Sequence, residues 1–97
     1  MKFKSETQVA EYFIKNIKKY GFRQSASQHK EDCQRWLKWL ENLFNEYQKS
    51  YGCYFKDDKF YEIETNEEVE QSVEDKLYIK KIQDLKTAIK LYEQVGI

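Results

Sequence analysis

The sequence predicts a mostly α-helical protein, a small bundle of about four helices with a short β-hairpin near residues 53–63. Apolar residues recur every three or four positions in three long segments, which is the spacing of one helix face. Proline is absent and glycine occurs three times, so few turn formers are available for a fold of many short strands. Sixteen aromatic side chains supply large apolar surfaces for a small core. The 97 residues fit a single helical domain, residues 1–97.

The first helix is predicted from about Glu6 to Tyr20. Ser5 or Thr7 is placed to cap its start, because a hydroxyl oxygen accepts from a free backbone N–H of the first turn. Gly21 follows the last turn, where glycine adopts a left-handed conformation at low cost. The apolar stripe of this helix consists of Val9, Ala10, Phe13, Ile14, Ile17 and Tyr20.

The second predicted helix is long and ends near Ser50 and Gly52. It starts at Ser25, which forms the pattern of a capping box with Gln28. Its apolar stripe consists of Cys33, Trp36, Leu37, Leu40, Leu43, Phe44 and Tyr47. Trp39 lies about 100° from the centre of this stripe. Because tryptophan is mostly buried, we expect Trp39 to pack under the first helix or the hairpin, with an exposed binding role as the alternative.

The region between the second helix and the last one is aromatic and then acidic. Two aromatic segments, 53–55 and 60–63, flank four polar residues and predict a hairpin with a four-residue loop. An irregular aromatic loop is the alternative for this region. A short acidic helix is expected from Thr65 or Asn66 to Val73, because acidic residues are favourable at a helix start.

The last helix is predicted from about Asp75 to Gln94, with Gly96 at its C-terminal cap. Its apolar stripe consists of Tyr78, Ile82, Leu85, Ala88, Ile89 and Tyr92. None of the three stripes can be buried by its own helix. We therefore expect the helices to pack together as a bundle.

The net charge is zero, but the charges are unevenly distributed along the chain. Residues 1–50 hold ten Lys and Arg against six Asp and Glu, and residues 51–97 hold seven against eleven. No stretch approaches the ~20 apolar residues of a membrane helix, and the start lacks the apolar run of a signal peptide. A cytoplasmic protein without a membrane partner is expected. Cys33 and Cys53 are expected as thiols, with a disulfide between them as the alternative.

His29 and Cys33 lie one helical turn apart and come closest to a metal or catalytic motif. Cys53 could supply a third zinc ligand, or His29 could act as the base for a Cys33 nucleophile. We expect neither, because no second Cys/His pair is present and Cys33 falls in the apolar stripe. We interpret the pair as a core cysteine, Cys33, beside a histidine in the first turn of the helix, His29. The carboxylates match no calcium loop and the glycines match no phosphate loop, so no enzyme, cofactor, metal site or small-molecule substrate is expected.

Basic and aromatic residues alternate in the first forty positions, which favours nucleic-acid binding through phosphate contacts and base stacking. The candidate nucleic-acid contacts are Lys15, Lys18, Lys19, Arg23, Lys30, Arg35, Lys38 and Trp39. The alternative function is a protein-binding regulator or inhibitor that acts through an aromatic or acidic face, with imitation of a phosphate backbone as one mode of binding. Its candidate contacts are Tyr54, Phe55, Glu62, Glu64, Glu67, Glu68 and Glu70.

One arrangement of motifs is familiar. The tetrapeptide KYGF at residues 19–22 ends one predicted helix, a turn with Ser25 and Ser27 follows, and WLKWL at residues 36–40 lies on the next helix. This arrangement resembles the helical core-binding (SAM-like) domain of tyrosine recombinases and phage integrases. Residues 60–92 are similar to modules that precede nuclease domains in some restriction and mobile-element proteins. Together these resemblances cover about two-thirds of the chain.

The resemblance implies a grip on duplex DNA in a phage or mobile-element setting. By this resemblance, the DNA contacts would be Lys18, Lys19, Arg23, Lys30, Arg35 and Lys38. The chain departs from the family in having no counterpart of the catalytic tyrosine and arginines, and in having no positive excess of charge.

Overall fold

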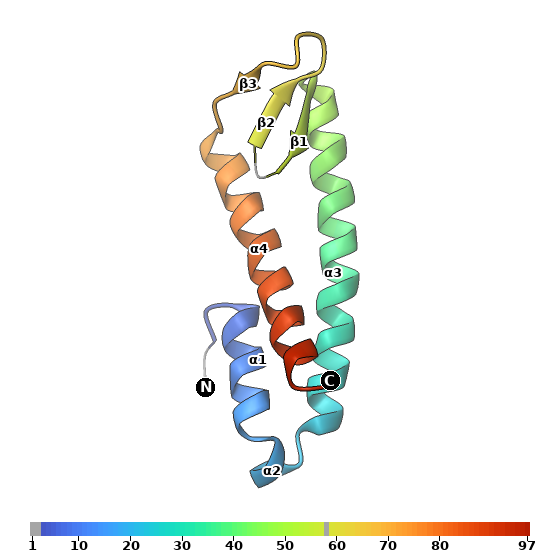
Figure 1. Cartoon of the computed structure of the whole chain (residues 1–97), viewed down its shortest axis with the longest axis vertical. Helices are drawn as coiled ribbons and strands as arrows, with labels where there is room; N and C mark the ends of the chain where they lie inside the picture. The colour runs from blue at the N-terminus through green and yellow to red at the C-terminus, as the bar shows by residue number, and fades with distance from the viewer. Residues whose placement is uncertain (1–2, 58) are drawn as a thin grey trace.

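Two long antiparallel helices, α3 and α4, form the frame of the protein, with a short helix beside one end and a small sheet at the other (Figure 1). The computed structural model describes residues 3–57 and 59–97, which extend over 54 × 21 × 18 Å. The elements are α1 (Glu6–Lys15), α2 (Ile17–Tyr20), α3 (Arg23–Ser50), β1 (Cys53–Lys56), β2 (Lys59–Glu62), β3 (Glu68–Val69) and α4 (Val73–Gln94). The predicted mostly α-helical class, with a short hairpin, is confirmed.

The first predicted helix is interrupted, because α1 ends at Lys15 and α2 starts at Ile17. At the break, the Asn16 side chain donates to the Tyr12 carbonyl at 2.8 Å, where it competes with the backbone ladder. Ser5 caps α1 as expected, with its Oγ accepting from the backbone N–H of Gln8. Beyond α2, the chain turns through a left-handed glycine, as predicted.

Helix α3 starts two residues before the predicted capping box, and that prediction is wrong. The Phe22 carbonyl already accepts from the Ala26 N–H at 2.8 Å, so Ser25 lies inside the helix. The Gln28 side chain donates to Asp32 rather than to a helix end. The Phe22 ring packs against Phe13, with ring centroids 5.5 Å apart, and this tertiary contact fixes the earlier start.

The predicted hairpin is present, and its strands reach further into the loop than expected. Tyr54 pairs with Tyr61, and the antiparallel register continues to Lys56 and Lys59. The expected acidic helix after the hairpin is wrong, because residues 68–69 form β3 on the free edge of β2. A backbone bond of 2.8 Å from Glu62 N–H to the Glu67 carbonyl extends that pairing.

Helix α4 starts at Val73, two residues before the predicted start. Its cap is a reciprocal pair: Ser72 Oγ accepts from the Asp75 N–H, and the Asp75 carboxylate accepts from the Ser72 N–H. At the other end, Gly96 has a φ of 79°, consistent with its predicted capping position. No described helix combines the length and the apolar character needed to cross a bilayer.

The core runs along the seam between α3 and α4 and continues under the sheet. At the sheet end, Phe44 of α3 contacts the rings of Phe55, Phe60 and Tyr78, with centroids 5.2–5.6 Å away. Phe55, expected to bind a partner, is therefore part of the fold. The buried apolar residues are Ala10, Ala26, Cys33, Leu40, Phe44, Phe60, Ile79, Ile82, Leu85, Ala88 and Tyr92.

Several residues predicted to be buried on α3 are exposed. The exposed fraction is 45% for Trp36, 39% for Leu43 and 65% for Trp39, so the expectation that Trp39 is packed away is wrong. The cause is helix length. The ten residues of α1 span about 15 Å, whereas the 28 residues of α3 span about 42 Å. Helix α1 therefore covers one end of the α3–α4 pair and the sheet covers the other, with a gap between them.

Candidate functional site

The gap between α1 and the sheet is an open groove of about 690 Å³, called here the central groove. Trp36, Trp39 and Leu43 line it from α3, and Tyr78 and Lys81 line it from α4. Lys4, Glu6 and Asp84 also reach it, so the groove is apolar along its length and charged near the start of α1.

The first group of candidate nucleic-acid contacts lies around α2, at one end of the molecule. We call this surface the basic end, and it consists of Lys15, Lys18, Lys19 and Arg23. All four side chains are exposed, and no acidic residue occurs between positions 12 and 30. Arg23 donates to the Gly96 carbonyl at 3.4 Å, which draws it toward the end of α4. The basic end therefore presents a local positive charge on a chain whose net charge is zero.

The second group lies on the solvent face of α3. Lys38 and Trp39 lie three and four positions after Arg35, so each is a neighbour of Arg35 on the helix surface, and the three residues are called here the Trp39 patch. Arg35 forms an ion pair with Asp32 of the preceding turn. Lys30 belongs to neither surface, because it is half-buried and donates to the Ile97 carbonyl at 2.9 Å. The fold thus divides the predicted interface into two surfaces, which are about 18 Å apart along α3 from Arg23 to Arg35.

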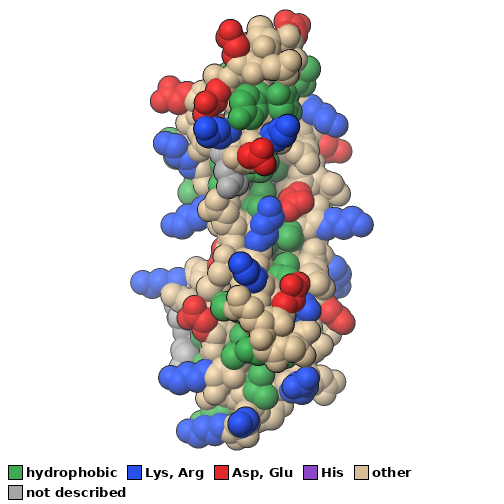
Figure 2. All heavy atoms as spheres, viewed as in Figure 1, with side chains coloured by type: hydrophobic (Ala, Val, Ile, Leu, Met, Phe, Trp, Pro, Cys, Tyr) green, Lys and Arg blue, Asp and Glu red, His purple; other side chains and the backbone are tan. Residues whose placement is uncertain are grey.

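The acidic residues gather at the opposite end of the molecule, beside the sheet. On the face in Figure 2, the outermost side chains are acidic at the sheet end and basic at the α2 end. The acidic end consists of Glu62, Glu64, Glu67, Glu68 and Glu70, all exposed. Tyr54 stacks on Tyr61 with ring centroids 5.4 Å apart and donates to the Asn66 side chain, so it is engaged within the sheet region.

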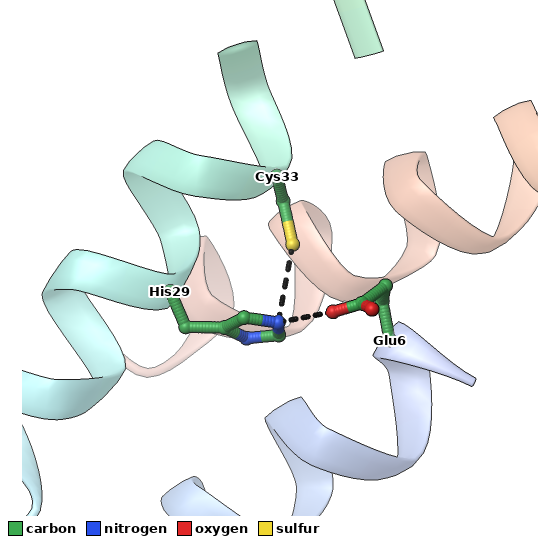
Figure 3. A group of neighbouring side chains, drawn as sticks. All are labelled: Glu6, His29 and Cys33. Atoms are coloured by element: carbon green, nitrogen blue, oxygen red, sulfur yellow. Dashed lines mark hydrogen bonds and ion pairs between the residues drawn. The ribbon is translucent and has the colours of Figure 1, made fainter. Parts of the chain in front are cut away.

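A buried polar group lies where α1, α3 and α4 meet. We call it the His29 cluster, formed by Glu6, His29, Cys33 and Tyr92. His29 is 8% exposed, and its Nδ1 lies 2.6 Å from the Tyr92 hydroxyl. Its Nε2 is hydrogen-bonded to the Glu6 carboxylate and lies 3.5 Å from Cys33 Sγ. Figure 3 shows the Glu6 and Cys33 side chains directed at the same ring nitrogen of His29.

The His29 cluster partly corrects the sequence analysis. Cys33 is a core cysteine as expected, but His29 lies in the second turn of α3 rather than in the first. Cys53, considered as a third ligand, lies in β1 at the far end of the molecule, and both cysteines are free thiols. Glu6 was not anticipated, because it is 23 positions from His29 and no local pattern links them.

Burial and nearby carboxylates control the ionisation of the cluster. Burial first, and then the negative charges of Glu6, Asp84 and Asp32, raise the pKa of the Cys33 thiol to about 12. Burial also raises the pKa of the Tyr92 hydroxyl, followed by the effect of Cys33. Both groups therefore keep their protons at neutral pH in the absence of a bound cation.

Asp84 of α4 anchors the start of α1 beside this cluster. Its carboxylate accepts from the backbone N–H groups of Glu6 and Thr7 at 2.9 and 3.0 Å, and from the Thr7 hydroxyl at 2.5 Å. Burial acts to raise the pKa of Asp84, but these hydrogen bonds outweigh it and hold the pKa below its usual value. Asp84 therefore caps α1 from a neighbouring helix and holds Glu6 close to His29.

Among residues 3–57 and 59–97, one group of three His, Cys, Asp or Glu side chains lies close enough together to share a cation. It consists of Glu6, His29 and Cys33. No family model matches this chain, and comparisons with curated proteins and with solved structures yielded no significant match. The resemblance to the core-binding domain of tyrosine recombinases stays a prediction from the sequence.

Proposed function

We propose that this protein is a non-enzymatic helical module that binds DNA, or a complex that handles DNA, through the basic end and the Trp39 patch. The observation that carries the proposal is the separation of charge along the molecule, with exposed cations at the α2 end and exposed carboxylates at the sheet end. A polyanion is attracted to one end and repelled from the other, so the charge asymmetry orients the encounter.

The Trp39 patch adds a second kind of contact. An exposed indole beside Arg35 and Lys38 offers a stacking surface next to two cations, the combination used for unpaired bases. The basic end offers point charges for phosphates without any base readout. Together, the two surfaces favour sequence-tolerant binding that includes single-stranded or distorted DNA.

The test is a fluorescence-anisotropy titration of labelled duplex and single-stranded DNA at ~50 and ~200 mM salt. About four phosphate contacts predict micromolar or tighter binding that weakens about a hundredfold between these salt concentrations. Absence of binding at both salt concentrations would contradict the proposal.

A matched pair of charge reversals locates the interface. The variant carrying Lys18→Glu and Lys19→Glu should lose tenfold or more in affinity, because two phosphate contacts become repulsions. The control carries Lys76→Glu and Lys80→Glu, exposed positions in the half of α4 nearer the sheet. It changes the net charge by the same amount and should bind nearly as well as the wild type. Equal losses in both variants would show a general charge effect and no basic-end interface.

A second candidate function rests on the acidic end, where five glutamates are exposed and Glu68 has a long contact of 4.0 Å with Lys59. Such a surface fits a protein with a basic groove, which it would occupy by imitating nucleic acid. Displacement of labelled duplex from basic DNA-binding proteins tests this function. Displacement by the wild type that is lost in the variant with Glu67→Lys, Glu68→Lys and Glu70→Lys would support this function. No displacement by the wild type would exclude it.

A further inference from the structure

We propose that Glu6, His29 and Cys33 form a binding site for one divalent transition-metal ion, for which the mixed donors favour Zn²⁺. The site would join α1 to α3 near the start of α1. It is independent of the proposed DNA binding, because none of its three residues belongs to the basic end or the Trp39 patch.

The spacing of the His29 and Cys33 donor atoms fits a tetrahedral ion. The ligand atoms of the three residues all lie within 4.8 Å of one another. His29 Nε2 and Cys33 Sγ are 3.5 Å apart, and zinc bonds of about 2.0–2.3 Å at a tetrahedral angle require an N–S separation of about 3.5 Å. The carboxylate of Glu6 is now paired directly with Nε2. For both to bind one ion, the Glu6 side chain would have to move outward, and that side chain is 35% exposed.

The surroundings of His29 suit a metal ligand. Ligating histidines usually donate their second ring N–H to a fixed acceptor, which orients the ring. Here Nδ1 lies 2.6 Å from the Tyr92 hydroxyl. With the proton on Nδ1 and Tyr92 accepting it, Nε2 presents its lone pair toward Cys33 and Glu6.

The local charge also favours a cation. The carboxylates of Glu6, Asp84 and Asp32 place negative charge around the Cys33 thiol, and a bound cation would offset that charge. Binding would release the thiol proton of Cys33 to solvent, because the thiolate is the ligand. Glu6 and Asp84 also line the central groove, so a water molecule can reach the fourth coordination position from that side.

Without a metal, the same atoms form a hydrogen-bonded cluster that joins three helices, so the decisive measurement is a signal from metal–thiolate bonding. The full chain is stripped with a chelator under reducing conditions and titrated with Co²⁺, a spectroscopic substitute for Zn²⁺. We expect one equivalent to bind, with visible bands of tetrahedral cobalt and a near-ultraviolet thiolate-to-cobalt charge-transfer band. Zn²⁺ should displace it. Absence of these bands in the wild type would overturn the proposal.

The two cysteines provide a matched control. Cys33→Ser should abolish the charge-transfer band, whereas Cys53→Ser should keep it, because Cys53 lies in β1 at the other end of the molecule. The opposite pattern, or a band that persists in both variants, would overturn the site.

A second variant keeps the proposal testable if Cys33→Ser does not fold. Glu6→Gln retains side-chain size and hydrogen-bonding capacity but replaces a charged ligand by a weak one. We expect a tenfold or greater loss of Co²⁺ affinity, with the charge-transfer band still reached at saturation. Zn²⁺ should raise the melting temperature of the stripped wild type more than that of this variant. Unchanged affinity in Glu6→Gln would overturn the proposal.

Discussion

The two ends of this elongated protein differ in the interactions that stabilise them. At the sheet end, aromatic rings from α4, β1 and β2 converge on Phe44 of α3, and the stabilisation comes from buried apolar area. At the α2 end, α1 is also attached through the hydrogen bonds of the His29 cluster and Asp84, and we call this arrangement the polar junction. The polar junction lies among buried apolar residues, including Ala10, Ala26 and Ala88, whereas the sheet end is built around aromatic rings.

This difference bears on function. The polar junction contains the acid, the histidine and the thiol of the proposed cation site, whereas the rings around Phe44 offer no such ligands. The surfaces follow the same division, because the polar junction lies near the basic end and the aromatic core lies under the acidic end. Substitutions at the two ends, each with its own measurable effect, test this difference.

The largest effect is expected at the aromatic core. Phe44→Ala should destabilise the protein by about 3–5 kcal/mol, because it removes a ring that is 1% exposed and leaves a cavity among three other rings. Chemical denaturation followed by circular dichroism measures this change. A loss below about 1 kcal/mol would mean that the sheet end collapses around the cavity and is not a tightly packed core.

At the polar junction, Tyr92→Phe should cost about 1–3 kcal/mol when measured with a chelator present. The substitution keeps the ring but removes the hydroxyl that faces His29 Nδ1, so a buried polar atom loses its partner. Tyr78→Phe is the matched control, because it makes the same change in a tyrosine whose ring packs on Phe44 at the sheet end. Equal effects of the two substitutions would remove the distinction between the junction and the core.

Local patterns in the sequence predicted most of the helices, because helix faces and glycine stops depend on neighbouring residues. The errors arose where distant parts of the chain decide. Phe22 packs on Phe13 and starts α3 ahead of the Ser25 box, and pairing with β2 converts the expected acidic helix into β3.

The candidate sites were harder to predict than the fold. The basic residues were visible as a pattern, but only the fold separates the basic end from the Trp39 patch. Glu6 contacts His29 because α1 packs on α3, and no rule of sequence spacing predicts such a contact. The exposure of Trp39 depends on where α1 starts and ends, a tertiary consequence of helix length.

A smaller effect is expected from Asp84→Ala, which removes the cap that α4 provides for α1. The backbone N–H groups of Glu6 and Thr7 lose their acceptor but lie near solvent, so the cost should be about 1–2 kcal/mol. Hydrogen exchange should show faster opening of α1 with little change in the sheet. Uniform loss of protection across the molecule would indicate that the two ends unfold as one unit.

The smallest effect on stability, paired with a clear effect on binding, is expected for Trp39→Ala. Because the Trp39 side chain is 65% exposed, its removal should change the free energy of unfolding by less than about 0.5 kcal/mol. If the indole stacks on a base, affinity for single-stranded DNA should fall by about 1–3 kcal/mol. Lys38→Ala gives the comparison, since loss of one phosphate contact lowers the salt dependence, whereas loss of stacking leaves it nearly unchanged. A Trp39→Ala variant with normal stability and normal binding would leave the basic end as the sole DNA contact. A variant that is strongly destabilised would instead place Trp39 in the core of the fold, and its exposure could no longer be used as an argument for binding.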